Sequence, residues 1–204
     1  MIAMINGYGY SSNTYVILDK DIIVVDPGSE ESFDKLMDEL EFITNKVDYI
    51  INTHCHYDHS SANYLLEEIF DCPTIIHDNE VNHLKRGDEV TVSWLFGKRL
   101  KAPKEIVPLS EVEIDFLKFV HTPGHTYGSI SIIYEDKVLT GDTLFSNSVG
   151  RWDLPTGNLE ELKSSILKLE RLIYENNIKE VLPGHGEVGN RKSLEIAKAL
   201  LGLR

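Results

Sequence analysis

Residues that bind transition metals cluster in one short segment, where His54, His56, Asp58 and His59 form the pattern His-x-His-x-Asp-His. Alternate side chains of an extended segment point to the same side, so His54 and His56 can hold one ion together. Asp58 and His59 come where the chain is expected to turn into a helix, and from there they can reach a second ion. Because imidazole and carboxylate are ligands of zinc and iron, the pattern indicates a metal site.

Three further candidate ligands follow later in the chain, and each comes directly after a glycine. They are His125 and His185, both in Pro-Gly-His, and Asp142 in Thr-Gly-Asp. Glycine lets the backbone bend sharply enough to aim the next side chain. A lone Gly-His pair is more often a simple turn, and solvated loop histidines are the alternative interpretation. Three such turns after three expected strands favour a shared site.

Alternating apolar and polar runs predict the elements that position these residues. We expect strands at residues 14–18, 22–25, 47–52, 73–76, 112–120, 129–134, 137–140 and 180–182. We expect helices at 31–43, from Ser60 or Ser61 to about 70, and at 78–85, 158–174 and 191–201. Residues 87–104 have no clear period and are expected to form a long loop, which could serve as a lid. Two β-then-α halves predict an α/β protein with two sheets packed face to face and helices outside.

Composition narrows the class of protein. The chain has 204 residues and a formal net charge of −13, which argues against nucleic-acid binding and fits a small-molecule substrate. Two cysteines are too few for a disulfide framework and fit a reducing cytoplasm. The chain has no apolar run long enough to span a membrane, and its start lacks the features of a signal peptide. We therefore expect a cytoplasmic protein; the sequence gives no oligomeric state.

The series of candidate ligands resembles the metallo-β-lactamase superfamily in order and rough spacing, over nearly the whole chain. The resemblance implies an αββα four-layer sandwich with the metal site at one edge of the two sheets. It implies one domain over residues 1–204, without the helical C-terminal substrate domain of full-length glyoxalase II. It also implies two divalent metal ions, most simply zinc, with iron or a zinc/iron pair as alternatives.

The resemblance also assigns a role to each candidate ligand. His54, His56 and His125 are expected to hold the first metal, and Asp58, His59 and His185 the second. Asp142 is expected to bridge the two ions. Asp58 and Asp142 are the expected catalytic residues, since they can also orient the nucleophile. Asp26, which ends a strand before Pro27-Gly28, is expected to support the ligand loop from behind.

Three segments resemble the glyoxalase II group in particular, which comprises hydroxyacylglutathione hydrolases and their short prokaryotic relatives. They are residues 121–129, 140–145 and 149–155. Position 142 is Asp, whereas the main zinc subclass of metallo-β-lactamases has Cys there, which counts against antibiotic hydrolysis. Arg151 resembles the basic residue that meets the thiol part of the substrate in this group. An alternative role is a partner for Asp153.

The function expected from this resemblance is thioester hydrolysis, with S-lactoylglutathione or another thiol ester as substrate. A hydroxide that bridges two metals is expected to attack the carbonyl carbon. The main alternative is a mononuclear-iron persulfide dioxygenase, a group that also has the Gly-Arg-x-Asp pattern. A lactonase and a phosphodiesterase are further alternatives.

Overall fold

The structure is a computed structural model that describes residues 1–203. The chain divides into two compact units, Met1–Val112 and Glu113–Arg204, and each unit builds its own sheet and covers it with its own helices. Among the described residues, no helix has the length and apolar character needed to cross a membrane.

The first unit contains a six-stranded mixed sheet in the order β1-β2-β3-β4-β5-β6. Its strands are β1 (Ile2–Ile5), β2 (Thr14–Leu18), β3 (Ile22–Val25), β4 (Tyr49–Ile51), β5 (Thr74–Ile76) and β6 (Ile106–Pro108). β1, β2 and β3 pair antiparallel, and β3 to β6 pair parallel. Because parallel strands end at the same edge, the loops after β3, β4 and β5 are neighbours.

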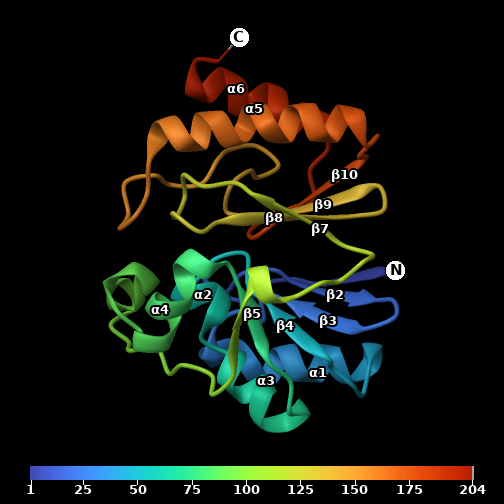
Figure 1. Ribbon diagram of the computed structural model, residues 1–204, viewed down its shortest axis with the longest axis vertical. Helices are drawn as coiled ribbons and strands as arrows, with labels where there is room; N and C mark the ends of the chain where they lie inside the picture. The colour runs from blue at the N-terminus through green and yellow to red at the C-terminus, as the bar shows by residue number, and fades with distance from the viewer. Residues whose placement is uncertain (204) are drawn as a thin grey trace. The chain divides into compact units, whose positions relative to one another are not determined.

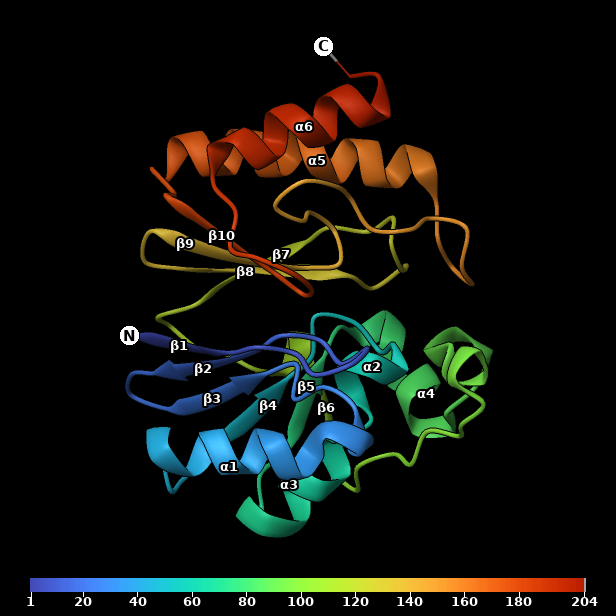
Figure 2. The same ribbon diagram turned by 180° about the vertical axis from the view of Figure 1, so that it is seen from behind.

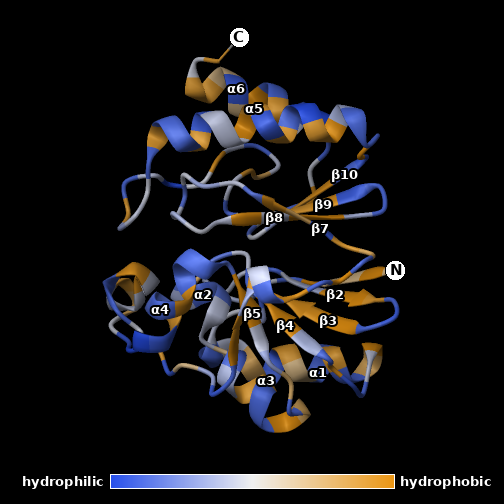
Figure 3. Cartoon of the chain, viewed as in Figure 1, coloured by the Kyte–Doolittle hydropathy of each residue, from blue (hydrophilic) through white to orange (hydrophobic). Residues whose placement is uncertain are grey.

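Helices cover this sheet because their apolar residues recur at helical spacing. The helices of the unit are α1 (Phe33–Ile43), α2 (Tyr57–Ser60), α3 (Asn63–Phe70) and α4 (Asp78–Arg86), with short 3-10 helices η1 (Glu30–Ser32), η2 (Glu89–Thr91), η3 (Ser93–Phe96) and η4 (Leu109–Glu111). α1 and α3 lie along one face of the sheet (Figure 1). Leu36 and Leu40 of α1 pack on Val24 and Ile50 in one core cluster. The strands of this core are strongly apolar in Figure 3.

The second unit contains a four-stranded mixed sheet in the order β10-β9-β8-β7. Its strands are β7 (Lys118–His121), β8 (Ile130–Tyr134), β9 (Lys137–Gly141) and β10 (Glu180–Pro183). β7, β8 and β9 pair antiparallel, and β10 pairs parallel with β9. β7, β9 and β10 therefore all run in the same direction and end at the same edge of their sheet.

Two helices, α5 (Leu159–Glu175) and α6 (Arg191–Leu201), cover one face of this sheet. Figure 2 shows α6 lying along α5. Ile166, Leu169 and Ile173 of α5 pack on sheet residues such as Val138 and Val181. Asn158 caps α5 by accepting hydrogen bonds from the backbone N–H groups of residues 160 and 161.

Most predicted elements are confirmed, with strands 14–18 and 22–25 and helix 191–201 found at the predicted bounds. β1 and β6 were not expected from the sequence. The strand expected at 112–120 is wrong in its first part: residues 112–117 are irregular, with a turn at Asp115 and Phe116, and the strand begins only at Lys118. The two mixed sheets with their helices confirm the α/β class.

The helix expected to run from Ser60 or Ser61 to about residue 70 is α3, which begins only at Asn63, with Ala62 at its N-cap. The separate short helix α2 precedes it, with His56 in an extended conformation at its N-cap. Neither serine caps α3, because both hydroxyl groups are engaged elsewhere. The Ser60 hydroxyl donates to the carbonyl of His56 at 2.9 Å, and the Ser61 hydroxyl accepts the N–H of Glu30 at 3.0 Å. The chain therefore enters α2 within the ligand pattern itself.

The long loop expected at residues 87–104 contains η2 and η3 and packs on its own unit. The ring of Phe96 lies 4.5 Å from that of Tyr10 and 5.4 Å from that of Tyr57, measured between centroids. Lys98 forms an ion pair with Glu31 at 2.7 Å. Aromatic packing and a charge contact thus hold this segment in place, while Trp94 and Leu95 are exposed.

Candidate metal centre

The first group of candidate ligands lies on one segment of the first unit, which comprises the loop after β4 and the short helix α2. The ring of His54 lies 4.5 Å from that of His56 and 4.2 Å from that of His59, between centroids. Ligand atoms of His54 and His56, of His54 and His59, and of Asp58 and His59 lie within 4.8 Å of one another. The segment predicted to bind metal therefore gathers its imidazole and carboxylate groups closely enough for metal coordination.

Asp26 lies behind this loop because it follows β3, the parallel neighbour of β4. Its carboxylate accepts hydrogen bonds from the Thr53 backbone N–H at 2.8 Å and the Thr53 hydroxyl at 2.6 Å. The carboxylate also contacts His59 Nδ1, at 2.9 Å. Because a carboxylate only accepts, His59 carries its proton on Nδ1 and presents Nε2 as a ligand atom.

The same carboxylate acts on His54 through Thr53. The hydroxyl of Thr53 gives its proton to Asp26, so its lone pair accepts from His54 Nδ1 at 3.0 Å. His54 therefore also carries its proton on Nδ1, which leaves its Nε2 as the ligand atom. One buried carboxylate fixes the protonated nitrogen of two candidate ligands.

Asp26 adopts a backbone conformation that few non-glycine residues take. Its φ is +50°, and its N–H donates to the carbonyl of Ile51 in β4 at 3.0 Å. A left-handed residue other than glycine costs on the order of 1 kcal/mol, and such strain is common at functional sites. The strain is offset by the contacts of the carboxylate with Thr53 and His59.

The second group of candidate ligands lies on three loops of the second unit. His125 follows β7, Asp142 follows β9 and His185 follows β10, so all three leave the same edge of the sheet. The N–H of Gly184 donates to the carbonyl of Gly141 at 2.8 Å. This bond joins the residues that immediately precede His185 and Asp142, and it fixes the two loops to each other.

Asp142 stands between the two histidines of this group. Its Oδ2 lies 3.6 Å from His125 Nε2 and 3.8 Å from His185 Nε2. Hydrogen bonds between such atoms are shorter than roughly 3.2 Å. Two ligand atoms that each lie about 2.0 to 2.2 Å from one tetrahedral ion are about 3.4 Å apart. The spacing therefore fits a carboxylate that shares one ion with each histidine.

The orientation of His125 is set by a backbone group. His125 Nδ1 donates to the carbonyl of Arg151 at 2.7 Å, which leaves Nε2 as its ligand atom. This contact requires close packing at Gly150, where an added Cβ would lie 1.8 Å from the Asp142 carbonyl oxygen and 3.0 Å from His125 Nδ1. Any larger residue at position 150 would displace two candidate ligands.

Glycine is also required immediately before His125. Gly124 has a φ of +130°, and an added Cβ would lie 2.3 Å from the backbone nitrogen of Leu162 in α5. Its carbonyl accepts the N–H of Asn158, the N-cap of α5, at 2.9 Å. The loop that carries His125 is thus held against the start of α5.

The side chain of Arg151 forms two hydrogen bonds with Asp153, at 2.9 and 2.8 Å. The hydrogen bonds from Arg151 hold the pKa of Asp153 below its usual range. Both side chains are exposed. The alternative role considered for Arg151, a partner for Asp153, is therefore present in the structure, and the substrate contact stays a prediction.

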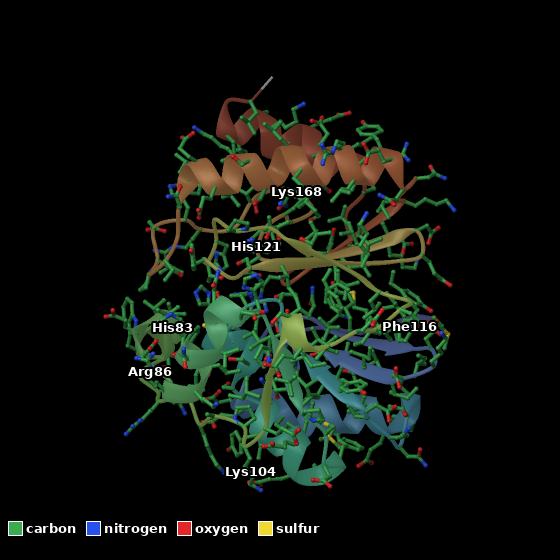
Figure 4. All side chains as sticks on the ribbon, in the orientation of Figure 1. His83, Arg86, Lys104, Phe116, His121 and Lys168 are labelled. Atoms are coloured by element: carbon green, nitrogen blue, oxygen red, sulfur yellow. The ribbon has the colours of Figure 1, made fainter. Side chains whose placement is uncertain are left out.

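The remaining histidines have structural contacts. His121 contacts the carbonyl of Tyr127 at 2.9 Å, and its own carbonyl accepts from Lys168 at 2.8 Å; Figure 4 labels both His121 and Lys168. His77 accepts from the N–H of Asn79 at the start of α4. His83, labelled on α4 in Figure 4, contacts Asp88 at 3.0 Å. These contacts place His77 at the N-cap of α4 and His83 in its last turn.

Cys55 lies between two candidate ligands and is fully buried. Burial and the charge of Glu80 raise the pKa of its thiol. The thiol of Cys55 therefore favours its protonated form, which is a poor metal ligand and a poor nucleophile.

The sequence interpretation missed four groups that contact the ligand loops. They are the Thr53 hydroxyl, Gly150, the Arg151 carbonyl and the Glu80 carboxylate. Thr53 could have been found from its place beside His54. The role of the Arg151 carbonyl could not be predicted, because every residue has a backbone carbonyl whatever its side chain. Glu80 could not be distinguished in the sequence from other charged residues of a helix.

Comparison with known proteins gives the family. Residues 7–185 match the Metallo-beta-lactamase superfamily, a region that includes all seven candidate ligands. The Probable metallo-hydrolase MJ0888 of Methanocaldococcus jannaschii is 58% identical over 206 residues, which cover 98% of this chain and 100% of that protein. The Probable metallo-hydrolase YqgX of Bacillus subtilis is 32% identical over 179 residues, with coverage of 84% and 83%.

Solved structures agree with this match. BLEG-1, described as a B3 metallo-beta-lactamase, is 27% identical with a TM-score of 0.83, over 98% of this chain and 99% of its own. TTHA1623, solved in a di-iron-bound form, is 27% identical with a TM-score of 0.81, over 97% and 96%. ETHE1 from Myxococcus xanthus is 25% identical with a TM-score of 0.70, over 94% and 80%. The fold is the predicted α/β metallo-β-lactamase fold, and the chain belongs to the metallo-β-lactamase superfamily.

Proposed function

We propose that this protein is a dinuclear metal-dependent hydrolase that acts on acyl thioesters of small thiols. In this proposal His54, His56 and His125 bind one metal, while Asp58, His59 and His185 bind the other. Asp142 bridges the two ions. The names of MJ0888 and YqgX, both probable metallo-hydrolases, support the general class of activity.

The position of Asp142 Oδ2 carries the proposal. It lies at similar distances, 3.6 and 3.8 Å, from ligand atoms of two histidines that are assigned to different metals. A carboxylate that served a single ion would need to approach only one of them. The intact set of ligands for a second metal, including His59 and His185, also favours two ions.

The residues of the chain bind and orient the metals. Asp26 holds His59 directly and His54 through Thr53, and the Arg151 carbonyl holds His125, so three imidazoles present Nε2. When bound, two such metals lower the pKa of a water toward about 7 and polarise a carbonyl, which is the chemistry of ester and thioester hydrolysis. Asp58 and Asp142, as ligands, also orient the nucleophile.

Two observations favour thioesters over other substrates. The segments at 121–129, 140–145 and 149–155 resemble the glyoxalase II group, and Asp rather than Cys stands at position 142. A hollow of about 410 Å³ beside His185 offers room for part of a small substrate; it is lined by Phe145, Ser148 and Glu187 among others. Arg151 can contact the thiol part if its guanidinium leaves Asp153.

The proposed metals are zinc or iron. The ligand set contains only imidazole and carboxylate groups, which suit both metals. TTHA1623 holds two irons, so an iron pair or a mixed pair fits the same fold.

A second candidate is a mononuclear-iron persulfide dioxygenase. The observation that favours it is the paired Arg151 and Asp153 in the pattern Gly-Arg-x-Asp, which that group also has. Without a substrate, the guanidinium of Arg151 is paired with the carboxylate of Asp153, and both side chains are exposed. The ligand set for a second metal is the main argument against this candidate.

The test is turnover by the purified protein with defined metals. Protein reconstituted with zinc or iron is assayed for hydrolysis of S-lactoylglutathione and of simpler S-acyl thiols, with a chelated sample as control. Oxygen uptake with glutathione persulfide and hydrolysis of a chromogenic β-lactam are measured in parallel, since BLEG-1 is described as a β-lactamase.

Thioester hydrolysis that disappears on chelation and returns with metal is the expected result. Oxygen uptake with one iron per chain, without thioester turnover, would replace the proposal with the dioxygenase. Rapid β-lactam hydrolysis without thioester turnover would also contradict it.

A further inference from the structure

We propose that Glu80 is a positioning residue of the metal centre, which fixes the peptide between His54 and His56 and thereby the spacing of the two imidazoles. The inference rests on the proposed metal site. It concerns a residue outside the ligand set, and it assigns a role to a buried charge that the proposed chemistry does not otherwise use.

Glu80 contacts the backbone of the ligand loop. Glu80 Oε2 accepts the backbone N–H of Cys55 at 2.6 Å, and Glu80 is only 1% exposed. A buried carboxylate costs several kcal/mol unless it is well hydrogen-bonded, so such a residue is retained where its contact matters. The peptide that it holds is the one that joins His54 to His56 through Cys55.

The apolar surroundings of this hydrogen bond strengthen it. Cys55 packs with Tyr57, Ile76, Leu84 and other apolar side chains in one cluster. A polar contact among apolar neighbours has low local screening and is therefore strong. Without an acceptor, the N–H of Cys55 would be left buried, which costs about 1 to 3 kcal/mol and favours a different loop conformation.

The topology places Glu80 opposite Asp26. The ligand loop follows β4, the strand that pairs parallel with β3 on one side and β5 on the other. Asp26 follows β3, and Glu80 comes from the first turn of α4, the helix that follows β5 and carries the labelled His83 and Arg86 in Figure 4. The loop is therefore held by two carboxylates, one from the residue that follows β3 and one from the helix that follows β5.

The two carboxylates act on different parts of the loop. Asp26 contacts Thr53 and His59, and so controls the imidazole nitrogens at the two ends of the pattern. Glu80 contacts the backbone in the middle, beside His56.

The chain offers a matched control in Glu67. Its carboxylate is also buried, at 8% exposure, and accepts the N–H groups of Lys104 and Glu105 at 2.6 Å each. Glu67 lies on α3 in the same unit, but the backbone it holds carries no candidate ligand. Loss of Glu67 therefore tests what a buried carboxylate contributes to folding alone.

The experiment compares Glu80→Ala, Glu80→Gln and Glu67→Ala with the parent protein. Each is stripped of metal, titrated with cobalt(II) in competition with a chelator, and followed by the visible spectrum of the bound cobalt. Thermal unfolding is recorded for every variant. Glu80→Gln keeps an acceptor for Cys55, so it gives a readout even where Glu80→Ala folds poorly.

Glu80→Ala is expected to weaken metal affinity about 10- to 100-fold, the range found for residues that orient ligands, and to change the cobalt spectrum. Glu80→Gln is expected to recover most of the affinity. Glu67→Ala is expected to unfold more easily while its cobalt affinity and spectrum stay those of the parent. Equal cobalt affinity in Glu80→Ala and the parent, or equal losses in Glu80→Ala and Glu67→Ala, would overturn the inference. A parent protein that binds no metal would overturn the proposed function first, and the inference with it.

Discussion

The two groups of candidate ligands are held in different ways. In the first unit, His54, His56, Asp58 and His59 share one loop, which buried carboxylates hold from outside. In the second unit, three ligands come from three loops, and backbone groups hold them, such as the Arg151 carbonyl and the bond between Gly184 and Gly141. A contiguous loop needs outside contacts to fix its shape, whereas separate loops are already fixed by the strands they leave.

This difference predicts where substitutions should act. In the first unit, the loss of a side-chain carboxylate should loosen metal binding with little change in packing. In the second unit, replacing the side chain of a supporting residue should change metal binding little. Adding a side chain at a supporting glycine should weaken metal binding strongly.

The largest effect is expected for Gly150→Ala. Its Cβ would meet the Asp142 carbonyl oxygen at 1.8 Å, so the loops that carry Asp142 and His125 must move. Overpacking of this kind costs about 1 to 3 kcal/mol, and the free energy of unfolding should fall by that amount together with metal content. Denaturant unfolding and elemental analysis measure the two effects. The control is Gly97→Ala, at a left-handed glycine with open space around it, which carries backbone strain but no overpacking and should keep its metal.

An intermediate effect is expected for Asp26→Asn. The new amide has one accepting oxygen, so either the backbone N–H of Thr53 or the Oδ2 contacts with the Thr53 hydroxyl and His59 are lost, and the ligand loop loses part of its support. Metal affinity should fall about 10- to 100-fold in a chelator competition. Asp153→Asn is the control in the second unit, because Asp153 pairs with a side chain that holds no ligand. If both variants lose affinity equally, the proposed difference between the units is wrong.

The smallest effect is expected for Arg151→Ala. The carbonyl that orients His125 remains, so metal content and the free energy of unfolding should match those of the parent. If Arg151 contacts the thiol part of the substrate, KM should rise a few-fold with little change in kcat, since exposed charge contacts are weak. Steady-state kinetics would reveal this pattern. Loss of metal from Arg151→Ala would mean that the side chain, and not the backbone, supports this ligand.

Much of the fold follows from local sequence, because most strands and helices are marked by apolar spacing. β1 and β6 were not predicted, because they are short and depend on pairing with β2 and β5. β6 also ends in Pro108, which has no N–H to donate to a neighbouring strand. The predicted start of α3 was two to three residues too early, because Ser60 and Ser61 use their hydroxyl groups in contacts that no local pattern reveals.

The candidate ligands could be predicted because metal chemistry restricts the residue types and glycine marks the turns. The residues that hold the candidate ligands could not be predicted in this way; Asp26 was named only because of the family resemblance. Thr53 acts because its hydroxyl lies between Asp26 and His54, which only the paired strands reveal. Gly150 is needed because of an approach to Asp142, eight positions earlier in the chain, that depends on how the loop folds.

The central claim is that Asp142 bridges two metals, and the number of metals per chain tests it most directly. Elemental analysis of the purified, metal-reconstituted protein is compared with Asp142→Ala prepared in the same way. The account predicts about two metals in the parent and about one or fewer in the variant, because a bridging carboxylate serves both ions. Two metals in both proteins, or a single metal in the parent, would contradict it.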